Sequence, residues 1–94
     1  MECLHVKISG IVQGVFFRSN TQQIASALGL TGWVKNCNDG SVEILAEGKK
    51  EKLEAFLEYC YRGPEGARVD KVDYKWLAAK GEFKDFKITH SDFI

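Results

Sequence analysis

The sequence has no long apolar segment and no excess of charge of either sign. The chain has 94 residues, and no part of it is a hydrophobic run long enough to form a membrane span. The 13 basic and 13 acidic side chains give a formal net charge of zero. Proteins that bind nucleic acids or membrane surfaces usually carry a basic excess. We therefore expect neither a nucleic acid nor a membrane as a partner.

The sequence lacks paired cysteines, a metal-binding spacing of its cysteines and histidines, and the pattern of a secretory signal. Cys3, Cys37 and Cys60 are odd in number and widely spaced, so we expect neither a disulfide framework nor a zinc site. His5 and His90 lack the spacing of metal ligands and are interpreted as strand surface residues. The chain does not begin with a basic region followed by an apolar run, as a secretory signal would. These absences predict a cytoplasmic protein with no metal and no other cofactor.

The hydrophobic periodicity predicts one domain, residues 1–94, without repeats or linkers. One helix is expected to begin at Ser19, because Ser19 and Gln22 have the spacing of a capping box, and to end near Gly29. A second helix is expected over 49–61, where apolar residues recur with helical spacing. Residues that alternate between apolar and polar predict strands at 4–9, 31–36, 41–47, 69–77 and 85–89.

The expected element order is β-α-β-β-α-β, with the last β part split in two. This order is typical of the ferredoxin-like α+β fold, a split β-α-β arrangement. It has a largely antiparallel sheet of four or five strands with two helices on one face. Trp33 and Trp76 are expected in the core or at its edge. Many functions share this fold, so the order alone does not assign one.

The segment from Gly10 to Arg18 runs from the end of a predicted strand to the start of a predicted helix. Backbone N–H groups in such a loop can bind a phosphate-sized anion, and an arginine can add a permanently charged fork. Gly14 permits a backbone conformation that a Cβ would hinder. Without further information, a tight turn followed by a surface arginine explains the same residues.

Three common phosphate-processing arrangements are absent from the sequence. Val12 stands where a Cys-x5-Arg phosphatase would need its nucleophilic cysteine. No Gly-x4-Gly-Lys-Ser/Thr loop is present, and no pair of carboxylates has a spacing that suggests a magnesium site. If this segment binds phosphate, we therefore expect it to do so without a nucleophilic cysteine and without a metal ion.

Two motifs together resemble the acylphosphatase family. They are Gly10-x-Val12-Gln13-Gly14-Val15-x-Phe17-Arg18 and, after the next predicted strand begins, Gly32-Trp33-Val34-Lys35-Asn36 with Asp39-Gly40-Ser41-Val42. The segments Gly63-Pro64, Ala67-Arg68-Val69 and Phe86-Lys87-Ile88 also resemble the family, so the likeness covers nearly the whole chain.

The resemblance implies an enzyme that hydrolyses acyl phosphates to a carboxylate and inorganic phosphate. Arg18 corresponds to the arginine that binds the phosphate, and Asn36 to the asparagine that positions the attacking water. The anion cradle corresponds to the backbone amides of Val12, Gln13, Gly14, Val15, Phe16 and Phe17. The expected partner is a small-molecule acyl phosphate, and the expected oligomeric state is a monomer.

Two residues depart from the usual family pattern. Cys37 follows Asn36 where threonine or another polar residue is common, and we expect that the hydroxyl of Ser41 could orient Asn36 instead. Phe16 is bulkier than the residue often found before Phe-Arg. It could narrow the mouth of the site or cover apolar surface, and we favour the second, because aromatic side chains near loops usually pack.

Other functions stay open at this point. A ferredoxin-like module without activity could bind a partner or a small anion. A relative of the acylphosphatase-like domain of hydrogenase-maturation proteins would act on carbamoyl phosphate, although the single short chain disfavours it. RNA binding through the sheet is disfavoured by the neutral charge and by the lack of an aromatic-rich RNP-type strand.

Overall fold

The computed structural model describes residues 1–14 and 16–89. The predictions for His90 and for the chain end at 91–94 therefore lie outside the described residues. Within them, the elements follow the order β1 (Glu2–Ile11), α1 (Phe17–Ala27), β2 (Thr31–Asn36), β3 (Val42–Gly48), α2 (Lys50–Arg62), β4 (Arg68–Ala78) and β5 (Phe86–Ile88).

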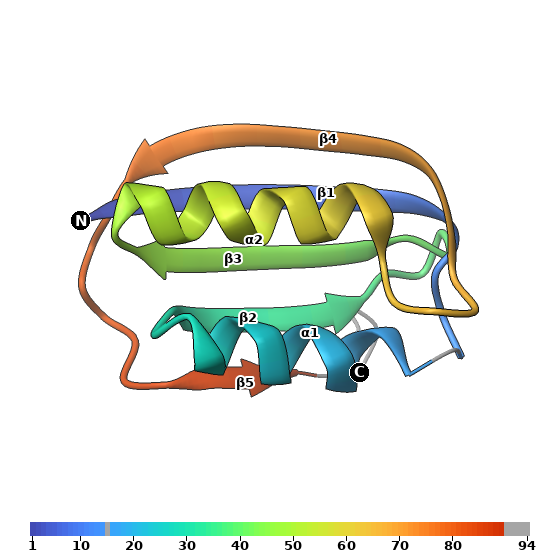
Figure 1. Ribbon diagram of the computed structural model, residues 1–94, viewed down its shortest axis with the longest axis horizontal. Coiled ribbons are helices and arrows are strands. Elements are labelled where there is room, and N and C mark those ends of the chain that lie inside the picture. The colour runs from blue at the N-terminus through green and yellow to red at the C-terminus, as the bar shows by residue number, and fades with distance from the viewer. Residues whose placement is uncertain (15, 90–94) are drawn as a thin grey trace.

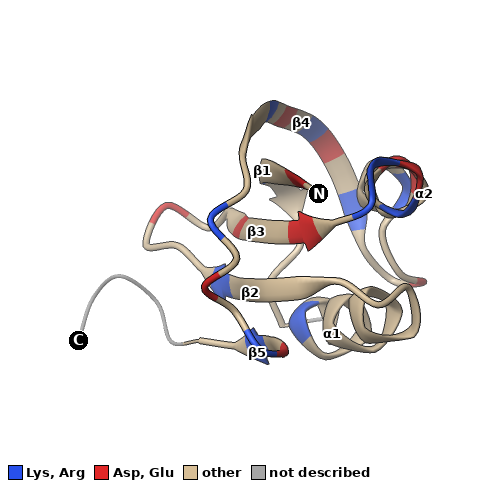
Figure 2. Cartoon of the chain, turned by 90° about the vertical axis from the view of Figure 1, so that its left-hand side faces the viewer, with Lys and Arg blue, Asp and Glu red and all other residues tan. Residues whose placement is uncertain are grey.

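The strands form one sheet in the order β4-β1-β3-β2-β5. β1 pairs antiparallel with both β3 and β4, and β2 pairs antiparallel with β3. β5 is parallel to β2. Figure 1 shows α1 and α2 side by side in front of the sheet, and in the turned view of Figure 2 both helices lie on the same side of it. The ferredoxin-like α+β prediction, with five strands, is confirmed.

The core lies between the sheet and the helices and follows from the alternation of the strands. Leu4, Val6 and Ile8 of β1 have no exposed surface, and each is paired with an equally buried residue of β3. Leu53 and Phe56 of α2 close this layer from above. Because side chains alternate across a strand, a slip of one residue would turn the apolar set away from the helices. Burial therefore fixes the register.

The opposite face of the sheet carries polar and aromatic side chains. The Nε2 atom of His5 lies 2.6 Å from Oε2 of Glu43, and Nζ of Lys35 lies 3.6 Å from Oε1 of the same carboxylate. Nζ of Lys35 also lies 5.0 Å from the ring centre of Trp33, which is half-buried.

Trp76 of edge strand β4 lies on the helix side of the sheet. It pairs with the buried Leu4, and its ring centre lies 5.8 Å from Nζ of Lys50 in α2. Because it is 36% exposed, it lies at the edge of the core and not within it.

The predicted start of the first helix was wrong. Helix α1 begins at Phe17, and the residue before it, Phe16, takes a left-handed conformation without a side-chain cap. Ser19 lies inside the helix, and Nε2 of Gln22 donates to the carbonyl oxygen of Phe86 at 3.0 Å. The capping-box pattern was misleading because the amide of Gln22 contacts β5 and does not turn back to the helix start.

Candidate active site

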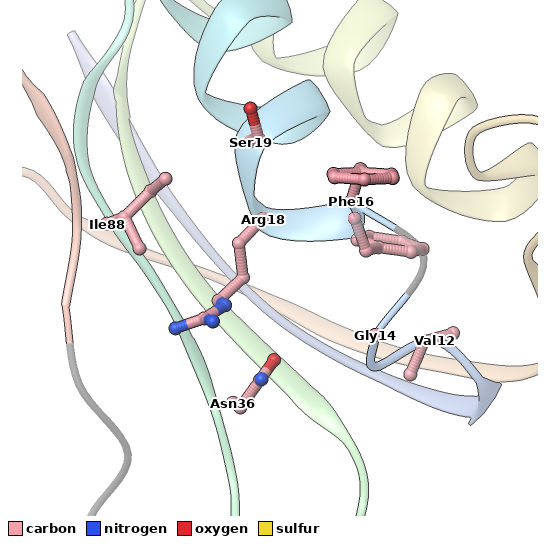
Figure 3. A pocket seen from close by; sticks show the side chains of 8 residues that line it. Val12, Gly14, Phe16, Arg18, Ser19, Asn36 and Ile88 are labelled. Atoms are coloured by element: carbon pink, nitrogen blue, oxygen red, sulfur yellow. The ribbon is translucent and has the colours of Figure 1, made fainter.

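A pocket of about 270 Å³ opens between the β1–α1 loop, the start of α1 and the end of β2. Figure 3 shows Arg18 and Asn36 in its middle and Phe16 and Ile88 on different sides. The pocket is lined by Val12, Gly14, Phe16, Phe17, Arg18, Ser19, Asn36 and Ile88. The two residues that carry the sequence-based prediction, Arg18 and Asn36, therefore share one site.

The loop that lines this pocket begins where β1 loses its pairing with β3 and then with β4. Pairing with β3 ends at Ile8, and a bulge follows between Ser9 and Gly10. The strand then continues beside β4 as far as Ile11, although the sequence predicted a loop from Gly10 onward. Pairing with the long edge strand β4 explains this extension. Val12 is fully buried and anchors the loop that follows.

Arg18 is placed by the residue before it. Phe17 is 1% exposed, and its ring centre lies 6.2 Å from that of Tyr59 in α2. Successive residues of a helix point in different directions, so anchoring Phe17 in the core turns Arg18 away from it. Figure 3 shows the Arg18 side chain extending from the start of α1 toward Asn36. The guanidinium thus lies near an amide from a different element.

Asn36 is the last residue of β2 and pairs with Val42 at the start of β3. The hairpin beyond it is closed by two bonds: the N–H of Cys37 donates to the Ser41 carbonyl at 2.8 Å, and the N–H of Gly40 donates to the Cys37 carbonyl at 3.1 Å. The side-chain oxygen Oδ1 of Asn36 is buried and has no hydrogen-bond partner among the described residues. Buried amide oxygens are rarely left unpaired, because this costs about 1–3 kcal/mol.

The carboxylate of Asp39 stabilises the hairpin turn by accepting hydrogen bonds from Ser41 and pairing with Lys7. The hydroxyl and the backbone N–H of Ser41 donate to Oδ1 of Asp39 at 2.6 and 3.0 Å, and Nζ of Lys7 lies 3.1 Å from Oδ2. The bonds from Ser41, together with Lys7, hold the pKa of Asp39 well below its usual range. The hydroxyl of Ser41 therefore binds Asp39, and the expectation that it orients Asn36 was wrong.

Cys37, the other departure in this hairpin, is buried. Its Sγ atom donates to Oε1 of Glu43 at 3.7 Å. The thiol therefore takes part in the polar network of the open sheet face.

The Gln13 side chain bridges the loop and the hairpin. Its Nε2 atom donates to the carbonyl oxygens of Cys37 and Ser41, both at 2.9 Å. Sequence reasoning grouped Gln13 with the anion cradle through its backbone, and its side chain has a second set of contacts that the motif did not reveal. Val15, another predicted cradle residue, lies outside the described residues.

Phe16 does not cover apolar surface, so that interpretation was wrong. Its side chain is 86% exposed, and its φ of 59° lies in a region that residues other than glycine seldom adopt. Ile88 of β5 lines the same pocket and is 39% exposed. Sequence reasoning did not assign Ile88 or Ser19 to the site. Ile88 carried no signal beyond strand alternation, since only the pairing of β5 with β2 brings it there.

The described part of the chain, residues 1–14 and 16–89, contains neither a cluster of metal-ligating side chains nor a helix that could span a membrane. No three or more His, Cys, Asp and Glu side chains are grouped there so that they could hold a metal ion. In the same residues, neither helix has the length and apolar character needed to cross a membrane.

The fold and the site define a ferredoxin-like α+β protein with an arginine and an asparagine in one pocket beside a strand–helix loop. The family model named Acylphosphatase matches residues 4–88. An acylphosphatase from Marinobacter nauticus is 54% identical over 86 residues, which are 92% of this chain and 94% of the relative.

Solved structures show the same similarity. The crystal structure of acylphosphatase from Bacillus subtilis has a TM-score of 0.91 and 36% identity, and the match covers 95% of this chain and 99% of that one. A structure of full-length HypF in the phosphate- and nucleotide-bound form has a TM-score of 0.87 and 33% identity, covering 98% of this chain but 12% of HypF. The chain belongs to the acylphosphatase family, whose members are hydrolases that act on acid anhydrides.

Proposed function

We propose that the chain hydrolyses the carboxyl-phosphate bond of acyl phosphates by in-line attack of water, with Arg18 binding the phosphate and Asn36 positioning the water. The observation that carries this proposal is the buried, unpaired Oδ1 of Asn36 in the pocket that Arg18 enters. A water molecule that donates a hydrogen bond to Oδ1 would satisfy this oxygen. Such a water would lie beside a phosphate bound to the guanidinium.

The phosphate is bound by charge and by backbone groups. The Arg18 guanidinium can form two parallel hydrogen bonds to phosphate oxygens, and it remains charged at any physiological pH. The backbone N–H groups of residues 12–17 add donors at the start of a helix, where the helix dipole favours an anion. Together they stabilise the charge that develops on the phosphoryl oxygens during transfer.

The reaction needs little acid–base chemistry from the protein. The water oxygen forms a bond to phosphorus, and the bond from phosphorus to the acyl oxygen breaks, with its electron pair leaving on the carboxylate. A carboxylate is a stable leaving group, so it needs no proton. The proton of the water goes to an oxygen of the substrate's own phosphate. Asn36 contributes orientation, which can account for about a hundredfold in rate when it is lost.

This mechanism requires neither a metal ion nor another cofactor, because Arg18 and the loop supply the positive charge. We further propose that the protein is a cytoplasmic monomer with a single domain over residues 1–94. Carbamoyl phosphate belongs in the substrate panel as well, because the sequence left open a relative of the acylphosphatase-like domain of hydrogenase-maturation proteins.

The test is hydrolysis of an aromatic acyl phosphate in EDTA, with inorganic phosphate as a competitive inhibitor. We expect wild type to turn over, Asn36→Ala to lose about a hundredfold in kcat with little change in phosphate inhibition, and Arg18→Ala to weaken both. Arg68→Ala and Asn38→Ala serve as matched controls, because both residues are exposed and lie outside the pocket.

Each part of the proposal has its own contrary result. Normal turnover by Asn36→Ala would show that this residue does not position the water. Unchanged inhibition by phosphate in Arg18→Ala would show that this arginine does not bind the phosphate. A folded wild type without activity would favour a binding module.

A further inference from the structure

The phosphate-binding groups and the proposed water-positioning group lie on separate segments of the chain. The loop and Arg18 follow β1, whereas Asn36 ends β2. β1 stops pairing with β3 at Ile8, before the loop begins, whereas its pairing with β4, on the other side, continues to Ile11. The sheet ladder therefore does not extend to the place where loop and hairpin meet.

Gln13 joins the two segments at this place. Its Nε2 donates to the carbonyl oxygens of Cys37 and Ser41, at 2.9 Å each. An amide nitrogen has two hydrogens, so it can serve both acceptors at once. The same two carbonyls accept the N–H bonds that close the hairpin, from Gly40 and Cys37. Gln13 thus binds the hairpin at the two carbonyls that close it, one of which belongs to the residue directly after Asn36.

The loop end of this bridge is also constrained. Val12, next to Gln13, is fully buried, and Phe17 at the other end of the loop is 1% exposed. A loop held at both of these points cannot shift its Gln13 amide far without moving a core residue. The two hydrogen bonds therefore fix the position of the loop relative to the hairpin.

We infer that Gln13 is a positioning residue that sets the distance between the phosphate held by the loop and Arg18 and the water held by Asn36. This inference rests on the proposed function. It predicts that kcat and phosphate binding respond differently to the loss of the Gln13 bonds. Phosphate binding is kept, because the loop and Arg18 stay together. Turnover falls, because the loop and Arg18 are no longer held at a fixed position relative to Asn36.

The test compares Gln13→Met with Gln22→Met. Both replacements remove an amide that donates from one element to a backbone carbonyl of another, because Gln22 Nε2 donates to Phe86 O at 3.0 Å. We expect Gln13→Met to lower kcat about tenfold to a hundredfold, with inhibition by inorganic phosphate changed by less than about threefold. Gln22→Met is expected to lower the unfolding midpoint and to keep kcat.

A double variant separates positioning from general loosening. If Gln13 acts through Asn36, Gln13→Met should cause no further loss of kcat in the Asn36→Ala background, because the contribution that it supports is already gone. Full additivity of the two losses would overturn the inference. Gln13→Asn keeps the amide but shortens its reach, so it should lower kcat by a smaller factor and again leave inhibition by phosphate nearly unchanged. It replaces Gln13→Met if that variant does not fold.

Failure of the inference and failure of the proposed function would give different results. Normal kcat in folded Gln13→Met, or a parallel loss of kcat and phosphate affinity, would overturn the inference and leave the proposed function in place. No turnover by folded wild type would overturn the proposed function, and the inference would fall with it.

Discussion

The side-chain hydroxyls of Thr21 and Tyr59 lie 2.9 Å apart and connect the two helices. Thr21 has no exposed surface and Tyr59 is 5% exposed. Nδ2 of Asn20 also donates to the Tyr59 hydroxyl, at 3.4 Å. Burial raises the pKa of Tyr59 above its usual value, although these hydrogen bonds oppose the shift. The first turns of α1, which include Arg18, are therefore held to α2 by hydrogen bonds.

Tyr59→Phe should lower the free energy of unfolding by about 1–2 kcal/mol, because it leaves the buried Thr21 hydroxyl without this partner. Replacing both residues, as Thr21→Val with Tyr59→Phe, should cost clearly less than the sum of the two single changes. Urea unfolding of the four proteins measures this coupling. Additive losses would mean that the two hydroxyls do not interact in solution.

Stability should fall in acid through Glu43. Burial by itself would raise the pKa of this carboxyl, but the hydrogen bond and charge of His5, with the charge of Lys35, lower it below its ordinary value of 4.5. A carboxyl with a lowered folded pKa stabilises the fold above its unfolded pKa. That contribution is lost as pH falls from about 4.5 through the folded value.

In Glu43→Gln, the fall in unfolding free energy between about pH 5 and pH 3 should accordingly be shallower than in wild type. Glu58→Gln, a change on the exposed side of α2, is the matched control. Thermal unfolding followed across this range measures the difference. Identical slopes in wild type and Glu43→Gln would contradict the assignment.

Gly32→Ala should be severely destabilising. An added Cβ would lie 1.9 Å from the carbonyl oxygen of Leu45, and the φ of 137° is itself unfavourable for alanine. We expect a loss of about 3 kcal/mol or more. Gly40→Ala is the control, because Gly40 has a φ of 92° but nothing within 4 Å of the added atom. Equal losses in the two variants, measured by denaturant unfolding, would show that the close approach is relieved at little cost.

Phe16→Gly should stabilise the fold, because the left-handed backbone at this position costs a side-chain-bearing residue about 1–2 kcal/mol. The exposed ring contributes little burial in return. We expect a gain of about 0.5–1 kcal/mol after the greater freedom of glycine in the unfolded chain is counted. Phe16→Ala removes the same ring and keeps the strain, so it should show no such gain. Calorimetry of both variants makes the comparison.

The elements could be predicted from the sequence because their periodicity is strong. The alternation of Leu4, Val6 and Ile8 marks a strand with one buried face, and the structure has it. The start of α1 could not be predicted, because the loop and the strained Phe16 determine it without a polar cap. The strand order was also outside the reach of periodicity. Recognising the element order as a known arrangement predicted the fold and the two helices on one face, and the order β4-β1-β3-β2-β5 comes from the structure.

The site shows the same division. Arg18 and Asn36 were predicted together through the motif resemblance, and one pocket contains both. Their chemical roles stay predictions. Ile88 reaches the pocket because β5 pairs with β2, a contact between distant parts of the chain. The bonds of Gln13 to the hairpin depend on side-chain direction, which residue spacing alone does not encode.

The strand order has a consequence for how the chain reaches this structure. Of the neighbouring strands in the sheet, β2 and β3 alone follow each other directly in the described sequence. Glu2 pairs with Ala78, and Gly32 pairs with Phe86. Such pairings must close long loops before burial offsets the lost entropy, which is typical of slow folding. Because β1 precedes β4 in the chain and β2 precedes β5, the sheet cannot be completed until both later strands have been synthesised.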